Sequence, residues 1–289
     1  MNPDSIGNYF VGLCCDGNAR FVAVDALAPA LEMKSRHGLA GNASVIAAEG
    51  MLTALLLSAH VKGDERLTLQ IAGETPQFSL VVDVNGDGTT RGRFVPQRLV
   101  PGRAFSGTLM VLKSLWQTEL YRSVADVKDE TLEDALRRFL VTSQQVDSRV
   151  WVQAERDRAG NLVFAGGLLV EKLPHADADD FRARLEGDRA PDLKLLMKGL
   201  GGIIGGDASI GGSLEILGAQ TIRYRCSCGP ERVRAILRGL GHEELRTIID
   251  EQGRAEVNCH FCNADYVVER EELEAIVVAL AEERPAGEA

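Results

Sequence analysis

The sequence lacks any apolar run long enough to cross a lipid bilayer. Its most apolar stretch, residues 50–61, lies between Glu49 and Lys62 and spans 12 residues, whereas a membrane-spanning helix needs about 20. The first twenty residues also lack a basic segment followed by an apolar one, the pattern of a secretory signal. We therefore expect a cytoplasmic protein with no membrane partner, in which residues 50–61 form a buried helix.

Positive charge is also scarce. The chain has 32 Lys and Arg against 42 Asp and Glu, a formal net charge of -10. Residues 221–289 contain nine arginines and no lysine against fourteen acidic residues, a local net charge of -5. Because proteins that bind nucleic acids usually present a basic face to the phosphates, we expect no nucleic-acid partner.

Cysteine is sparse but clustered. Four of the six cysteines form two tight pairs, Cys226-X-Cys228 and Cys259-X-X-Cys262. In a reducing compartment such clusters more often bind metal or react with oxidants than form permanent disulfides. Four thiolates can close a tetrahedral Zn²⁺ site with no open position for a substrate. The spacing leaves two hypotheses open, a zinc ion that only staples a small domain and a zinc site that responds to oxidants.

The one-residue spacing of Cys226 and Cys228 favours the second hypothesis. Two sulfurs so close in sequence can pair locally on oxidation, and strained disulfides have labile, regulatory potentials. Zinc keeps cysteine as the thiolate, which is the form that peroxide and hypochlorite attack.

Residues 1–173 alternate strand and helix patterns. Apolar and polar residues alternate in RLTLQIA (66–72) and QFSLVVDV (77–84), and a glycine-containing turn at 85–88 predicts a hairpin into 89–95. Further strands are expected near 107–113, 148–155 and 162–172, and an amphipathic helix within 130–145. The sequence predicts an α+β fold whose N-terminal mixed α/β-sheet domain covers residues 1–173.

The composition changes between residues 174 and 221. Seven glycines occur between positions 199 and 212, and glycine loses much conformational freedom on folding. This stretch should therefore be marginally stable and depend on docking, yet it keeps apolar residues that release would expose. The glycines do not form a phosphate-binding loop, because Asp207 stands where lysine is required. We predict a metastable helical and glycine-rich linker at 174–221 and a small zinc-binding domain at 222–289.

Longer stretches resemble a known family. IRYRCSCGPERV (222–233) and GHEELRTIIDEQGRAEVNCHFCNADYVV (241–268) closely resemble the zinc domain of the redox-regulated thirty-three-kilodalton heat-shock chaperones. ALLLSAHVKGDERLTLQI (54–71), RGRF (91–94) and GGLLVEKLP (166–174) resemble the N-terminal domain of the same family, in the same order.

This resemblance implies a redox-regulated, ATP-independent holdase with a zinc ion and no catalytic turnover, so not an enzyme. The reduced, zinc-bound form would be a poor chaperone. Oxidation would pair Cys226 with Cys228 and Cys259 with Cys262, release zinc and unfold the C-terminal part and the linker. The oxidised chains would form homodimers, and these would hold unfolding client proteins.

Other functions remain open. A zinc-stapled adaptor or nucleic-acid-binding protein would bind its partner constitutively. A thiol oxidoreductase would need a cysteine pair on a thioredoxin-like βαβ unit, and the C-terminal region has too few strands for one. We expect Cys14 and Cys15 to be partly buried strand residues without redox work, and His260 to be an exposed bystander.

Overall fold

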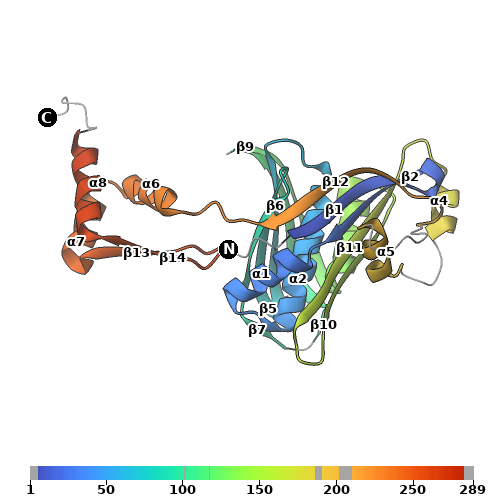
Figure 1. Cartoon of the computed structure of the whole chain (residues 1–289), viewed down its shortest axis with the longest axis horizontal. Helices are drawn as coiled ribbons and strands as arrows, with labels where there is room; N and C mark the ends of the chain where they lie inside the picture. Colours follow the sequence, from blue (N-terminus) through green and yellow to red (C-terminus); the bar gives the residue numbers. More distant parts are fainter. Residues whose placement is uncertain (1–5, 101, 117, 186–190, 202–209, 283–289) are drawn as a thin grey trace. The chain divides into compact units, whose positions relative to one another are not determined.

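The computed structural model of the chain describes residues 6–100, 102–116, 118–185, 191–201 and 210–282 (Figure 1). The chain divides into two compact units, Met1–Arg225 and Cys226–Ala289. The first unit combines one large sheet with helices and the second is mainly helical, so the predicted α+β class is confirmed.

A ten-stranded sheet forms the first unit. Its strands in chain order are β1 (Ile6–Cys14), β2 (Ala19–Asp25), β4 (Glu65–Thr75), β5 (Gln77–Asn85), β6 (Thr89–Val95), β8 (Phe105–Leu115), β9 (Thr118–Glu130), β10 (Ser148–Arg156), β11 (Leu162–Lys172) and β12 (Glu215–Tyr224). Their spatial order is β10-β11-β2-β1-β12-β6-β5-β4-β8-β9. Every strand expected from the sequence is present. Strands β4, β5 and β10 carry the alternating pattern of a strand with one buried face, whereas β11 is buried along nearly its whole length.

One junction in this sheet differs from the others. All neighbouring strands are antiparallel except β12 and β6, which are parallel and pair only at Arg223↔Thr89 and Tyr224↔Thr90. On its other side β12 pairs with β1 along most of its length. The two short strands β3 (Ala40–Gly41) and β7 (Arg98–Leu99) form a separate ladder.

Helix α2 (Asn42–Leu57) forms the centre of the first unit. It packs against β10 and β11 from one half of the sheet and against β4, β5 and β6 from the other, and nearly all of its residues are buried. A side chain at Gly50 would overlap Leu80 of β5, so glycine permits the close approach. Helices α1 (Leu27–His37) and α3 (Leu132–Phe139) pack beside α2.

The length and composition of α2 with its following turn, Asn42–His60, would suffice for a membrane span. It is the one such helix in the part of the chain that the structure describes. Of its apolar 18-residue window, 83% is buried inside the protein. The buried helix expected around residues 50–61 is therefore confirmed.

The described part of residues 174–221 belongs to the first unit and packs on its sheet. It contains α4 (Ala178–Leu185), α5 (Leu193–Leu200) and the first residues of β12. Helix α5 contacts β11 and β2 and buries Leu193, Leu196, Met197 and Leu200. Glycines 202, 205 and 206 lie outside the described residues, and the predicted division into three parts stays a prediction.

The second unit is built from α6 (Pro230–Leu240), α7 (His242–Gln252), a hairpin of β13 (Arg254–Asn258) and β14 (Asp265–Glu269), and α8 (Arg270–Glu282). Helices α6 and α7 meet at Gly241. Their apolar residues form a small core with α8 and the hairpin: Val233, Leu237, Leu245, Ile249, Ala255, Val268, Leu273, Ile276 and Val277.

A buried carboxyl in α2 makes the stability of the first unit depend on pH. Glu49 is 4% exposed and lies 3.3 Å from Arg103, and burial raises its pKa from 4.5 to about 7 despite that arginine. The folded state thus binds the proton more tightly than the unfolded chain, so stability is lost as pH rises from 4.5 through about 7.

We expect Glu49→Gln to remove this loss, which amounts to roughly 3 kcal/mol. Urea unfolding between about pH 5 and about pH 8 measures it. The matched control is Glu119→Gln, which changes an exposed glutamate of β9. Equal pH slopes for wild type and Glu49→Gln would contradict the assignment.

Candidate metal centre

Two loops of the chain bring four cysteines together. Cys226 and Cys228 lie in the extended stretch between β12 and α6, which begins with Pro230 at its first position. Cys259 and Cys262 lie in the turn that joins β13 to β14. One ligand pair is therefore carried by a hairpin turn and the other by the segment that enters a helix.

The four Sγ atoms all lie within 4.8 Å of one another. The Sγ atoms of Cys226 and Cys259 are 3.7 Å apart, and those of Cys228 and Cys262 are 3.1 Å apart. Around a tetrahedral zinc ion with Zn–S bonds of about 2.3 Å, neighbouring sulfurs are roughly 3.8 Å apart. The four cysteines could thus hold one metal ion, and four thiolates are a donor set that zinc prefers.

The hairpin turn is closed by backbone hydrogen bonds that shape one half of the site. The Cys259 N–H donates to the carbonyl of Ala264 at 2.9 Å, and the Asn263 N–H donates to the carbonyl of Cys259 at 2.7 Å. Asn263 has a φ of 55°, a left-handed conformation that asparagine tolerates better than most residues. The turn therefore directs Cys259 and Cys262 to the same side.

The thiols of this turn differ in acidity. Burial alone would raise the pKa of Cys259, but hydrogen bonds from the backbone N–H groups of Cys262 and Phe261 and from neighbouring thiols lower it to about 7. Burial and its hydrogen bond with Cys228 raise the pKa of Cys262. Anionic sulfurs this close repel one another, so a full set of four thiolates requires a cation among them.

The structure adds one polar neighbour that the sequence analysis missed. The hydroxyl of Tyr266 in β14 donates a hydrogen bond to Cys228 Sγ at 3.1 Å, and this bond raises the pKa of Tyr266. Tyr266 lies four residues after Cys262, and the sequence pattern alone did not show which way its side chain points. His260, by contrast, is exposed, as expected.

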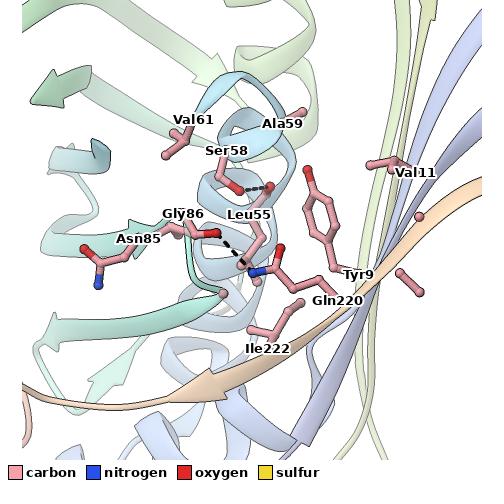
Figure 2. Close-up of a pocket in the computed structure, with 14 residues that line it drawn as sticks. Tyr9, Val11, Leu55, Ser58, Ala59, Val61, Asn85, Gly86, Gln220 and Ile222 are labelled. Atoms are coloured by element: carbon pink, nitrogen blue, oxygen red, sulfur yellow. Dashed lines mark hydrogen bonds between the residues drawn. The ribbon is translucent and has the colours of Figure 1, made fainter. Parts of the chain in front are cut away.

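A pocket of about 270 Å³ in the first unit is a separate candidate site (Figure 2). It opens where β12 diverges from β6, over the end of α2, and none of its lining residues is charged. The amide of Gln220 donates to the Gly86 carbonyl at 3.1 Å, and the Ser58 hydroxyl donates to the Leu55 carbonyl at 2.6 Å. Burial raises the pKa of Tyr9 to about 12, so this pocket offers no acid–base pair that titrates near neutral pH.

Comparisons with known proteins agree with the geometry. The model of the family described as Hsp33 protein matches residues 8–269, which include all four clustered cysteines. The 33 kDa chaperonin of Bacillus licheniformis is 33% identical over 277 residues, which cover 90% of this chain and 95% of the relative. The 33 kDa chaperonin of Bacillus subtilis is 32% identical over 282 residues, covering 91% and 96%.

A solved structure has the same fold. The 33 kDa chaperonin (heat shock protein 33 homolog) of Thermotoga maritima matches with a TM-score of 0.75 over 96% of this chain and 99% of that chain. The two sequences are 22% identical, so this likeness concerns the fold.

We expect Tyr266→Phe to weaken metal binding, because groups that hydrogen-bond to metal ligands hold those ligands in place. The affinity for Zn²⁺, measured by competition with a chromophoric chelator, should fall by roughly tenfold. Tyr121→Phe, in β9 of the first unit, is the matched control. An unchanged Zn²⁺ affinity in Tyr266→Phe would show that the hydrogen bond does not support the site.

Proposed function

Because this chain belongs to the Hsp33 family of chaperones, we propose that it is a cytoplasmic, redox-regulated holdase that binds unfolding client proteins without ATP. The observation that carries the redox part is the cluster of four sulfurs within 4.8 Å of one another. No other group of three or more potential metal ligands is found among the described residues.

In the resting form, Cys226, Cys228, Cys259 and Cys262 would hold one Zn²⁺ as thiolates. The ion compensates the negative charge of the four sulfurs and joins the entry to α6 to the β13–β14 turn. The four side chains then have no free ligand position, which suits a structural or sensing centre and not a catalytic one. In this state we expect weak client binding.

Oxidation would change the sulfurs from ligands to disulfides. In each pair two thiols lose two protons and two electrons to one peroxide molecule, which yields one S–S bond and two water molecules. We propose the local pairs Cys226–Cys228 and Cys259–Cys262. The sulfur–sulfur contacts of 3.7 and 3.1 Å instead join Cys226 with Cys259 and Cys228 with Cys262, so the alternative pairing needs an explicit test.

Loss of the metal would destabilise the second unit, whose core is small. Structural zinc contributes on the order of 10 kcal/mol to the folding of small zinc domains. We propose that this loss of folding free energy in the second unit also destabilises the docking of residues 174–221. The buried side chains of α5, Leu193, Leu196, Met197 and Leu200, would then become available to clients and to a second copy of the chain.

Aggregation assays test the switch. We expect the reduced, zinc-loaded protein to suppress aggregation of heat-unfolding citrate synthase weakly, and the peroxide- or hypochlorite-treated protein to suppress it strongly, in proportion to the zinc released. The control is Tyr121→Phe in β9, which leaves all six cysteines unchanged. Zinc release without any gain in client binding would instead favour a structural zinc domain in a constitutive adaptor.

Peptide mapping tests the disulfide pairing. Because Arg225, Arg232, Arg254 and Arg270 flank the motifs, trypsin would release the two pairs on separate peptides, CSCGPER (226–232) and AEVNCHFCNADYVVER (255–270). After oxidation and alkylation of free thiols, we expect each peptide to have lost two hydrogens. A single species in which both peptides are joined would replace local pairing with the alternative pairing.

A further inference from the structure

The two remaining cysteines lie far from the metal cluster in sequence. Cys14 is the last residue of β1, and Cys15 begins the short 3₁₀ turn Cys15–Gly17 that leads into β2. Partial burial was expected, but both side chains are completely buried. They belong to the apolar cluster on the face of the sheet that α5 covers, together with Phe181, Leu193, Leu196, Met197, Leu200 and Ile210.

This burial depends on residues that follow strand β11 in the chain. The Cys15 N–H donates to the carbonyl of Ile210 at 3.3 Å, and the Cys15 thiol donates to the same oxygen at 3.6 Å. A Cβ atom on Gly211 would lie 2.9 Å from Cys15 Sγ, so the chain passes directly over the sulfur. The cover over Cys15 is thus made by residues 195 positions away.

Ionic and polar hydrogen bonds also hold the segment around Gly211 against the turn that contains the cysteines. The carboxylate of Asp16 accepts hydrogen bonds from Arg184 Nη1 at 2.7 Å and from the Ser213 hydroxyl at 3.1 Å. Arg184 also donates to the carbonyl of Gly211 at 3.2 Å. Asp16 itself is exposed, so the two thiols lie directly beneath a surface turn and are shielded by one peripheral segment.

While this segment is docked, both thiols are chemically inert. Burial raises the pKa of Cys14, and burial also raises the pKa of Cys15. Oxidants react with the thiolate, so low exposure and low thiolate content act in the same direction. Removing the cover would expose the turn to solvent and remove both forms of protection together.

We propose that Cys14 and Cys15 form a second, conditional oxidation site, which residues 181–185, 193–200 and 210–213 mask while docked and which hydrogen peroxide converts to a Cys14–Cys15 disulfide once they undock. One thiolate attacks peroxide to give a sulfenic acid and hydroxide, and the hydroxide takes up the proton that the thiol had released to become water. The neighbouring thiol then displaces the sulfenic hydroxyl as a second water, which forms the S–S bond. Where undocking follows metal loss, the inference rests on the proposed function.

The oxidised pair would hinder the return of the segment. A disulfide has no S–H to donate to the Ile210 carbonyl, and its sulfurs must leave the positions that fit beneath Gly211. The Cα atoms of adjacent residues are about 3.8 Å apart, closer than in ordinary disulfides, so the bond is strained and easily reduced. Oxidation of this pair would therefore prolong the undocked state until a reductant acts.

The test uses the full chain and undocks the segment without changing the metal ligands. Leu196→Ala removes a side chain that is 5% exposed in the cluster, and Leu195→Ala, at a position 57% exposed on the same helix, is the matched control. Trypsin would release Cys14 and Cys15 on a peptide ending at Arg20 that contains no other cysteine. Loss of two hydrogens from this peptide after peroxide treatment and alkylation reports the disulfide.

We expect the peptide to be oxidised in Leu196→Ala and to remain reduced in wild type and in Leu195→Ala at early times of peroxide treatment, before a zinc indicator in the same samples reports any zinc release. Amide hydrogen exchange at residues 193–200 should be about tenfold faster in oxidised than in reduced Leu196→Ala. That difference should vanish when Cys14→Ala and Cys15→Ala are added. Circular dichroism verifies that the variants are folded.

The outcomes separate this inference from the proposed function. Oxidation of the peptide in Leu196→Ala, but not in wild type after zinc loss, would support the masked site and count against coupling between the metal and undocking. Oxidation in both would support both. A reduced peptide in Leu196→Ala whose α5 amides exchange fast, or an oxidised peptide in Leu195→Ala while its zinc is still bound and its α5 amides exchange slowly, would overturn the masked site.

Discussion

Mutual repulsion between four sulfurs is the constraint on which the second unit depends. Within 4.8 Å of one another, the sulfurs of two loops cannot all be thiolates unless a cation lies among them. The surroundings of the two turn cysteines act in opposite directions. Backbone N–H groups in the β13–β14 turn favour the charged form of Cys259, whereas burial disfavours the charged form of Cys262. A core as small as that of the helices and hairpin offers few other contacts to hold the two loops together.

The first unit depends on a different kind of contact. Its central helix is enclosed by both halves of the sheet, whereas, among the residues that the structure describes, α4, α5 and the residues around Ile210 pack on the outer face. Helices of eight residues are marginal by themselves, so α5 depends on docking for its structure. This asymmetry gives the protein one stable body and one peripheral cover, the arrangement that a release mechanism requires.

Cysteines in the two units are protected in opposite ways. Three of the four clustered cysteines are partly exposed and Cys262 is buried, and we propose that a bound cation compensates their charge. Cys14 and Cys15 are neutral and protected by apolar packing. Oxidants would therefore reach the first set directly and the second set only after a conformational change, which orders the two events in time.

Much of this could be predicted from the sequence, because the relevant signals are local. Alternation in residues 66–72 and 77–84 reports the strands, and the spacing of Cys226, Cys228, Cys259 and Cys262 reports the cluster. The pattern did not reveal β12, since exposed and buried residues do not alternate along its first half. Its place in the sheet comes from pairing with β1, more than two hundred residues earlier.

The sequence by itself determined the strand periodicity, the buried central helix and the two cysteine pairs of the cluster, since each follows from residue types at short separations. Only the tertiary structure decided that Tyr266 reaches Cys228 and that Ile210 and Gly211 cover Cys15. Those contacts join residues 38 and 195 positions apart. Their existence depends on how complete elements pack, which local pattern does not encode.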